Sequence, residues 1–568
     1  MMRFSLAAML LVFATTARAA DPLDFVPAQA LLVLKVENPR KLADALTSLD
    51  AYKSARELTA FRNAYDTTTA RRLYQMLGYV ERELGAKWPA LLEQLGGNGV
   101  VLASSLGDND APALIVLQGT DEKQVAKGFD LIFKLIEEEM VRQGAKEKPV
   151  RTEYKGHPAA RVGDFRFARV GTAVLVSNKD DVLKAAIDTG TGKGENVRGK
   201  KSFAAAKKLL PPDPLAWLWL DFAAIKESKA SKDFFEATRK DFLQTLVVGS
   251  TIDCLKRSDF VAVGLHQEAG GLRLAVRFPA GRDAFPPEFA LHVPPKGEPG
   301  SLPLLEPPGV IYSQSFHLDV GYGWKHRDKL VNEQTRKDID EGEKQISKVI
   351  PGSLKFGQLL EVWGPYHRVV VVNHDKMPYK TVPTDRYPAF GYVATMRDKA
   401  FGSSAESLIR SGGLIASLQL GMKSAEQEHE GVPIVGYRFN EAKPFAEDPE
   451  NVRFNFEPCF AIVGDDLIAA STFEVCKKLI TEVKRTAKLP PSAAVWRNRA
   501  FAAGAADALA ALPDPLVTNA ILGQGVGIED ARKQVAELVA WLRTVGTARV
   551  EIDERATEYR LDVVWTNK

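Results

Sequence analysis

Hydrophobic and polar positions follow the same pattern in two distant parts of the chain. Residues 167–187 read FARVGTAVLVSNKDDVLKAAI, and residues 460–480 read FAIVGDDLIAASTFEVCKKLI. In each stretch two short apolar runs flank a turn that contains Gly171 or Gly464, which predicts a β-hairpin. A capping residue then opens a helix whose apolar residues recur at helical spacing. Because hairpin and helix each have one apolar face to bury, we expect a helix lying on an antiparallel sheet.

Further matches between the two parts keep the same order along the chain. Residues 91–93 match residues 359–361, Pro112 matches Pro388, and the hairpin that ends at Phe278 matches the hairpin that ends at Trp565. Chance matches would not stay collinear, so the pattern predicts a tandem duplication with insertions in the loops.

The fold class expected from these patterns is α+β, with each half a mainly antiparallel sheet carrying helices on one face. In the last hairpin Val550 and Ile552 alternate with Arg549 and Glu551, which is typical of a strand with one buried and one solvated face. Prolines crowd the stretch after Phe278, which favours an extended connector over a helix or a central strand. The expected segments are a signal peptide at residues 1–20, a first repeat half at 24–282, a Pro-rich connector at 283–304 and a second repeat half at 305–568.

The N-terminus has the features of a secretory signal peptide. Arg3 is followed by an apolar run over residues 4–14 and by the small-x-small site at residues 17–19, so cleavage is expected after Ala19 or Ala20. No later apolar run reaches the roughly 18 residues that a membrane span needs. We expect an exported protein, periplasmic or extracellular, with no membrane span in the mature chain.

The charge of the chain bears on its class of partner, and its cysteine content bears on the presence of disulfides. The 75 basic and 72 acidic residues give a formal charge of +3, which is no electrostatic footprint for nucleic acid. Cys254, Cys459 and Cys476 are the three cysteines of the 568-residue chain, too few for a disulfide framework. Cys459 and Cys476 flank the second hairpin, and the sequence leaves open whether they form a bridge.

The start of the mature chain, FVPAQALLVLKVENPRKLADAL, together with the two hairpin-helix units, resembles a family of exported bacterial proteins of unknown function. Their mature chains begin with a Val-Pro-Ala-x-Ala strand and an Asn-Pro or Asp-Pro turn. The resemblance implies an α+β repeat architecture and export. It supplies no catalytic residues.

No motif predicts a catalytic, cofactor-binding or metal site. The sequence GTGKG at residues 190–194 lacks the earlier Gly and the Ser or Thr after Lys193 that a phosphate loop needs, and it follows a helix instead of preceding one. His367 and His374 are expected on opposite faces of a strand. His429 and Glu430 lack the second His of a zinc-protease helix.

The remaining polar candidates have simpler interpretations. An acidic cluster lacks the spacing of a calcium loop and is interleaved with lysines, so we expect a solvated helix face; its members are Asp338, Asp340, Glu341 and Glu343. The chain has no Gly-x-Ser-x-Gly elbow.

Trp217 and Trp219 share one face of a strand that is apolar on both faces. Such a strand is either central in the core or forms an apolar wall of a ligand cavity. Since the recurring features are all explained by folding, we expect a non-enzymatic binding or interaction protein, with an apolar small molecule or another exported protein as partner. The alternative is an exported hydrolase with a dispersed active site in one half, and the sequence leaves the question of enzyme activity open.

Overall fold

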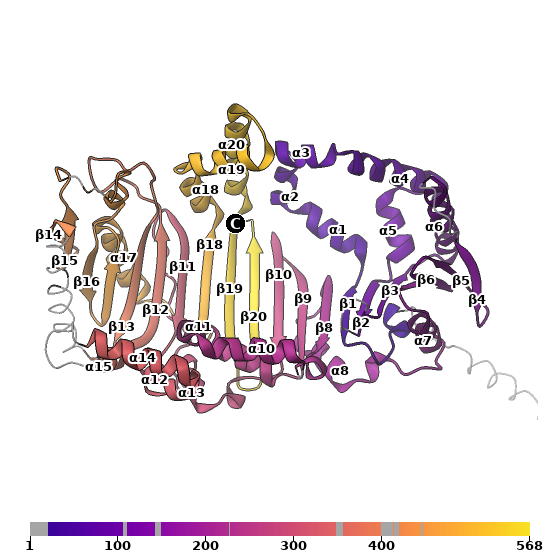
Figure 1. The fold of residues 1–568 in the computed structure, drawn as a ribbon, viewed down its shortest axis with the longest axis horizontal. Helices are drawn as coiled ribbons and strands as arrows, with labels where there is room; N and C mark the ends of the chain where they lie inside the picture. Colours follow the sequence, from indigo (N-terminus) through magenta and orange to yellow (C-terminus); the bar gives the residue numbers. More distant parts are fainter. Residues whose placement is uncertain are drawn as a thin grey trace, which may run out of the picture. The chain divides into compact units, whose positions relative to one another are not determined.

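The computed structural model describes residues 21–105, 111–142, 149–226, 228–347, 356–398, 410, 413, 420–443, 445 and 447–567. The chain is an α+β protein, and the strand pairs with known register are all antiparallel (Figure 1), as expected from the sequence. It forms two compact units. The first unit comprises Met1–Thr47, Tyr65–Ala224 and Phe260–His266, and the second comprises Ser48–Ala64, Ile225–Asp259 and Gln267–Lys568. The expected signal peptide lies outside the described residues.

The first unit is built on a sheet with the strand order β4-β5-β6-β7-β3-β2-β1-β8-β9. The strands are β1 (Leu32–Val36), β2 (Val100–Ser104), β3 (Ala113–Gln118), β4 (Val150–Tyr154), β5 (His157–Val162), β6 (Phe165–Val170), β7 (Ala173–Ser177), β8 (Ala216–Asp221) and β9 (Phe260–Glu268). The helices are η1 (Pro22–Phe25), α1 (Pro39–Ser48), α4 (Thr68–Leu84), α5 (Trp88–Gly96), α6 (Glu122–Arg142), α7 (Asp180–Gly190), η2 (Val197–Gly199), α8 (Lys201–Leu209) and α9 (Phe222–Ile225).

Helices cover both faces of this sheet, which corrects the expectation of helices on one face. Ala168 and Leu175 pack with residues of α7 in the main core. Phe167 and Val174, their neighbours in sequence, pack instead with Phe133 of α6. Adjacent residues of a strand point to opposite faces, so α6 and α7 sandwich the β6–β7 hairpin between them.

Both hairpin-helix units predicted from the sequence are present. Gly171 lies in the turn between β6 and β7 with φ +57°, and Gly464 lies in the turn between β16 and β17 with φ +62°. This left-handed conformation strains residues that carry a Cβ atom, so glycine suits both turns. The helices follow as α7 and α17, and the Thr472 hydroxyl caps α17 by accepting from the Val475 amide at 3.2 Å.

The second unit is built on a sheet with the strand order β10-β20-β19-β18-β11-β12-β13-β17-β16-β15-β14. The strands are β10 (Gly271–Phe278), β11 (Val310–His317), β12 (Trp363–Val372), β13 (Ala389–Met396), β14 (Met422–His429), β15 (Val432–Phe439), β16 (Cys459–Val463), β17 (Asp466–Ala470), β18 (Trp496–Phe501), β19 (Thr547–Glu554) and β20 (Tyr559–Thr566).

Helix α17 packs against one face of this sheet, with Ile480 and Cys476 fully buried against strands β13, β15 and β16. Cys459 and Cys476 are neighbours there and remain free thiols. The other helices are α2 (Asp50–Ala55), α3 (Thr59–Tyr65), α10 (Lys229–Ala237), η3 (Thr238–Lys240), α11 (Phe242–Arg257), η4 (Arg282–Ala284), η5 (Pro287–His292), α12 (Val320–Lys325), α13 (Arg327–Leu330), α14 (Glu333–Ile346), α15 (Phe356–Val362), η6 (Val452–Asn455), α17 (Phe473–Thr486), α18 (Ala502–Ala510), α19 (Pro513–Gln524) and α20 (Ile528–Val545).

The Pro-rich stretch differs from a simple extended connector. It contains the short helices η4 and η5, and Leu291 and Ser301 within it are fully buried. Proline is compatible with the first turn of a helix, and η5 begins at Pro287. The stretch therefore packs as part of the second unit.

Candidate functional site

Arginines and aspartates are segregated to one face of seven neighbouring strands in the second unit. On β10, β20, β19, β18, β11, β12 and β13 the register places every Arg and Asp on the same face, where Arg273 and Arg277 pair with Asp562 at 3.0 and 2.9 Å. We call the opposite face the uncharged face. Its residues are Leu272, Leu274, Val276, Phe278, Tyr559, Leu561, Val563, Trp565, Ala548, Val550, Ile552, Glu554, Trp496, Asn498, Ala500, Tyr312, Gln314, Phe316, His367, Val369, Val371, Phe390, Tyr392, Ala394 and Met396.

Helices contact the uncharged face at its two ends. At one end Ser250 and Thr251 of α11 hydrogen-bond Glu554 and Tyr559, at 3.1 and 2.7 Å. At the other end the Trp565 indole donates to the backbone oxygen of Val545 in α20, at 2.8 Å. Figure 1 shows the strands running between α10 and α11 on one side and α18 to α20 on the other.

The middle of the uncharged face is accessible. Leu274 and Phe390 are 38% and 52% exposed, and the apolar residues of β19 and β20 between the two ends are half-buried. The final hairpin therefore differs from the expected pattern, because its Val550 face and its Arg549 face are half-buried alike. A large apolar sheet surface left open to solvent usually marks a binding surface.

A cavity of about 720 Å³ adjoins this face at β13. Its walls come mainly from β13 to β17 and the segment before β16, and they carry aromatic, aliphatic and sulfur-containing side chains. The lining residues are Phe390, Tyr392, Gly413, Leu420, Met422, Tyr437, Phe456, Pro458, Cys459, Phe460, Ala469, Ala470 and Ser471.

The described residues that line the cavity carry no charge at neutral pH. Burial raises the pKa of the Cys459 thiol well above its usual range, with the neighbouring Cys476 adding to the effect, so the thiol stays protonated and unreactive. Burial also raises the pKa of Tyr392 to about 12. The phenol of Tyr437 donates to the backbone oxygen of Arg410 at 3.1 Å.

Tyr392 and His367 form a hydrogen-bonded pair beside the cavity. His367 Nε2 lies 2.8 Å from the backbone oxygen of Leu318 and donates to it. Nδ1 is therefore the acceptor, and the Tyr392 hydroxyl donates to it at 2.6 Å. Burial lowers the pKa of His367. Both ring nitrogens are thus engaged by the protein, and the pair fixes the orientation of the Tyr392 ring.

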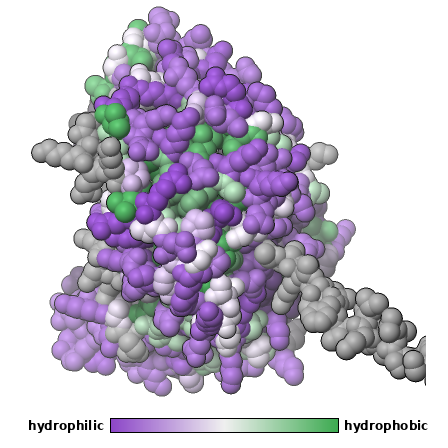
Figure 2. Space-filling model, turned by 90° about the vertical axis from the view of Figure 1, so that its right-hand side faces the viewer, coloured by the Kyte–Doolittle hydropathy of each residue, from purple (hydrophilic) through white to green (hydrophobic). Residues whose placement is uncertain are grey.

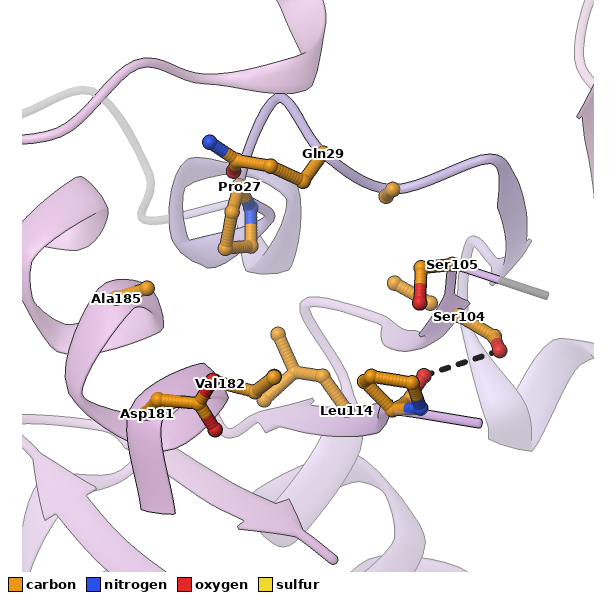
Figure 3. A pocket seen from close by; sticks show the side chains of 11 residues that line it. Pro27, Gln29, Ser104, Ser105, Leu114, Asp181, Val182 and Ala185 are labelled. Carbon is orange, nitrogen blue, oxygen red and sulfur yellow. Dashed lines mark hydrogen bonds between the residues drawn. The ribbon is translucent and has the colours of Figure 1, made fainter. Parts of the chain in front are cut away.

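The first unit has a smaller cavity of about 290 Å³. Figure 3 shows Pro27 and Gln29 from the loop before β1, Leu114 from β3, and Asp181 and Val182 from the first turn of α7. The rest of the lining is Ala30, Ala103, Ser104, Ser105, Pro112 and Ala185. The Ser104 hydroxyl is used by the protein, since it donates to the backbone oxygen of Pro112 at 3.0 Å.

The surface around the first unit is mainly hydrophilic. Figure 2 shows hydrophilic residues predominating on the side that lies to the right in Figure 1, with hydrophobic residues gathered toward the middle of the view.

The cavity of the second unit is larger than the cavity of the first unit and more uniformly apolar, so it is the stronger candidate site.

Trp217 and Trp219 belong to the core of the first unit. They are 2% and 0% exposed and pack against Phe203 of α8, with ring centroids 5.4 and 5.2 Å apart. The cavity-wall interpretation is wrong for both residues, because α8 covers their face of β8.

The structure separates the histidines noted in the sequence. His367 lies on the uncharged face, whereas His374 follows the end of β12. His429 contacts the Thr481 hydroxyl at 3.0 Å, and that hydroxyl donates to Glu430 at 2.6 Å. In the part of the chain that the structure describes, no cluster of His, Cys, Asp and Glu could hold a metal ion.

The acidic cluster and the Gly-rich stretch have structural roles. The acidic residues lie on α14, where Asp340 accepts two hydrogen bonds from Arg327, both at 3.0 Å. In the Gly-rich stretch α7 ends at Gly190, and Gly192 follows with φ +78°. The stretch therefore terminates a helix, as expected.

Comparisons with known proteins give little. No family model and no curated protein matches the chain. Two crystal forms of the Treponema lipoprotein TP0453 align with 48% of this chain. Form IV aligns over 85% of its own chain at 8% identity with a TM-score of 0.26, and form I over 82% at 9% identity with a TM-score of 0.25. Superpositions of this quality establish neither a shared fold nor a shared function. No helix within the described ranges is long and apolar enough to span a membrane.

Proposed function

We propose that the protein is a non-enzymatic binding protein that holds an apolar molecule in the cavity over β13 to β17. The observation that carries this proposal is a cavity of about 720 Å³ lined by uncharged, largely hydrocarbon surface. Ligand sites typically measure about 300–1,000 Å³ and are mostly apolar. The site favours binding over catalysis because its Tyr, Cys and His groups are neutral and hydrogen-bonded or buried within the protein.

The chain is further proposed to be exported and to have arisen by duplication. Export rests on the basic residue, apolar run and cleavage site of residues 1–20. Duplication is supported by the strand orders. Replacing β4, β5, β6, β7, β3, β2, β1, β8 and β9 by β14, β15, β16, β17, β13, β12, β11, β18 and β19 converts the order of the first sheet into the order of nine of the eleven strands of the second, with β20 and β10 following β19.

The cavity can be tested by filling it. Ala469 on β17 is exposed to the cavity, and Ala469→Trp would place an indole ring inside it. The full chain should bind diphenylhexatriene, an uncharged probe that fluoresces in apolar surroundings. Ala469→Trp should weaken this binding at least about tenfold, which corresponds to about 1.4 kcal/mol of binding free energy.

The matched control is Ala442→Trp, in an exposed turn outside the cavity. It should bind the probe as the wild type does. No binding by the wild-type chain, or equal binding by both variants, would contradict the proposed function.

A further inference from the structure

Three polar side chains interrupt the uncharged face at its centre. Gln314 of β11 lies directly opposite Asn498 of β18, and Tyr312 is the next residue of β11 on the same face. The Tyr312 hydroxyl donates to the Gln314 side-chain oxygen at 2.6 Å, and the Asn498 side chain hydrogen-bonds that hydroxyl. We call Tyr312, Gln314 and Asn498 the polar triad.

The triad retains hydrogen-bonding capacity. Within the described part of the chain, the side-chain nitrogen of Gln314 has no protein partner, although its oxygen accepts from Tyr312. All three residues are half-buried. Their neighbours on the same face are apolar, with Val369 opposite Gln314 on one side and Val550 opposite Asn498 on the other.

The triad and the cavity lie within reach of one small molecule. Gln314 is opposite Val369 on β12, and Val369 is opposite Tyr392 on β13, which lines the cavity. Neighbouring strands are about 4.8 Å apart, so two steps place the triad roughly 10 Å from the cavity wall. The surface between them is the apolar side chain of Val369.

The charge distribution restricts the ligand. Every Arg and Asp on these seven strands points to the other face, and the single acid on the uncharged face, Glu554, is buried against α11. A charged head group placed at the triad would be partly desolvated without a counter-ion, which is costly, whereas an uncharged one would exchange hydrogen bonds with Gln314 and Asn498.

We propose that the polar triad binds the uncharged, hydrogen-bonding head group of an acyl lipid whose hydrocarbon chain enters the cavity. This inference rests on the proposed function, and it adds a ligand class: lipids with a glycerol-like head in preference to those with an anionic head.

The test compares two lipids that differ in one group. Displacement of diphenylhexatriene from the full chain is measured with a monoacylglycerol and with a lysophosphatidate of the same acyl chain. The wild type should bind the monoacylglycerol at least about tenfold more tightly. The double variant Gln314→Leu with Asn498→Leu should lose about tenfold in monoacylglycerol affinity, the effect of losing one or two hydrogen bonds, and keep its affinity for the probe.

Controls separate the possible failures. Gln334→Leu makes the same change on an exposed position of α14 and should leave both affinities unchanged, and Gln314→Glu should lose monoacylglycerol binding without loss of side-chain volume. If the probe binds but both lipids displace it equally, or the double variant retains the preference, the head-group inference is wrong and the cavity proposal stands. If native mass spectrometry shows that a second copy of the chain excludes both probe and lipid, both proposals fail.

Discussion

Because the Glu554 carboxyl is buried, we expect the protein to lose stability as pH rises. Its Oε1 accepts from the Ser250 hydroxyl at 3.1 Å, while its buried Oε2 has no partner among the described residues. Burial is the main cause that raises its pKa from 4.5 to about 8. The residue is therefore protonated at neutral pH in the folded chain and ionised in the unfolded chain.

The direction of this pH dependence follows from the number of protons that the folded and the unfolded states bind. Below pH 4.5 both states are protonated and the carboxyl costs nothing. Between pH 4.5 and about 8 the folded state holds one proton more, so stability falls by roughly 1.4 kcal/mol per pH unit, and above pH 8 the loss is complete at about 5 kcal/mol. Glu554→Gln keeps the shape and the acceptor for Ser250 but cannot ionise, so it should remove this slope.

Two compact units need not unfold together, so a local measurement is needed. Hydrogen exchange of the α11 amides, compared between variant and wild type at each pH, reports the free energy of opening where Glu554 packs. The difference should be near zero at pH 4.5 and reach a few kcal/mol in favour of Glu554→Gln at pH 8. Glu529→Gln, at an exposed residue of α20, should show no such trend. A difference that does not grow with pH would refute the reasoning.

Three further predictions concern stability. Burial lowers the pKa of His292 from 6.5 to about 4. The unfolded chain therefore binds a proton below pH 6.5 that the folded chain does not bind, and stability should fall by up to about 3 kcal/mol on acidification to pH 4. His292→Gln should remove that fall, as measured by hydrogen exchange of η5 and α11. Ile480→Ala in the fully buried face of α17 should lower the free energy of unfolding by about 2–5 kcal/mol, as measured by urea unfolding. The control Leu522→Ala, at an 81% exposed position, should lower it by under about 0.5 kcal/mol. Arg277→Met should cost about 1–3 kcal/mol in the same assay, because it removes a cation that is 2% exposed from its pair with Asp562, while Asp562 keeps its pair with Arg273.

Local patterns in the sequence predicted local structure well. The two hairpin-helix units appear where expected, with glycines of positive φ in their turns and a threonine cap on α17. Strand β1 (Leu32–Val36) lies within the apolar run at the start of the mature chain, and the first turn of α6 is capped by Asp121, which accepts from the Gln124 amide at 3.1 Å. These features depend on neighbours in sequence, which is why a single sequence reveals them.

The same sequence patterns did not show which helix covers which face of the sheet. Alternation shows that two faces of a strand differ, but it does not say what packs on either. The sequence therefore favoured the core for Trp217 but left a cavity wall open as the alternative, and the position of α8 over that face decides for the core. Helix α6 lies on the opposite face from α7 because of the path the chain takes between β3 and β4, and no periodicity within the hairpin records that path.

The polar triad was hidden for a related reason. Tyr312 and Gln314 alternate with Ser313 and Ser315, and Asn498 stands between Arg497 and Arg499, so each strand alone reads as polar on both faces. Only the register between β11 and β18 shows that these side chains meet on the face that is otherwise apolar. The buried serines and the arginines lie on the other face, where Ser313 and Ser315 are fully buried. In this sheet the polar residues point partly inward and the apolar ones partly outward, the reverse of what burial alone favours. Burial alone does not favour the exposure of Leu274 and Phe390, and this exposure agrees with the proposal that an apolar ligand binds at this face.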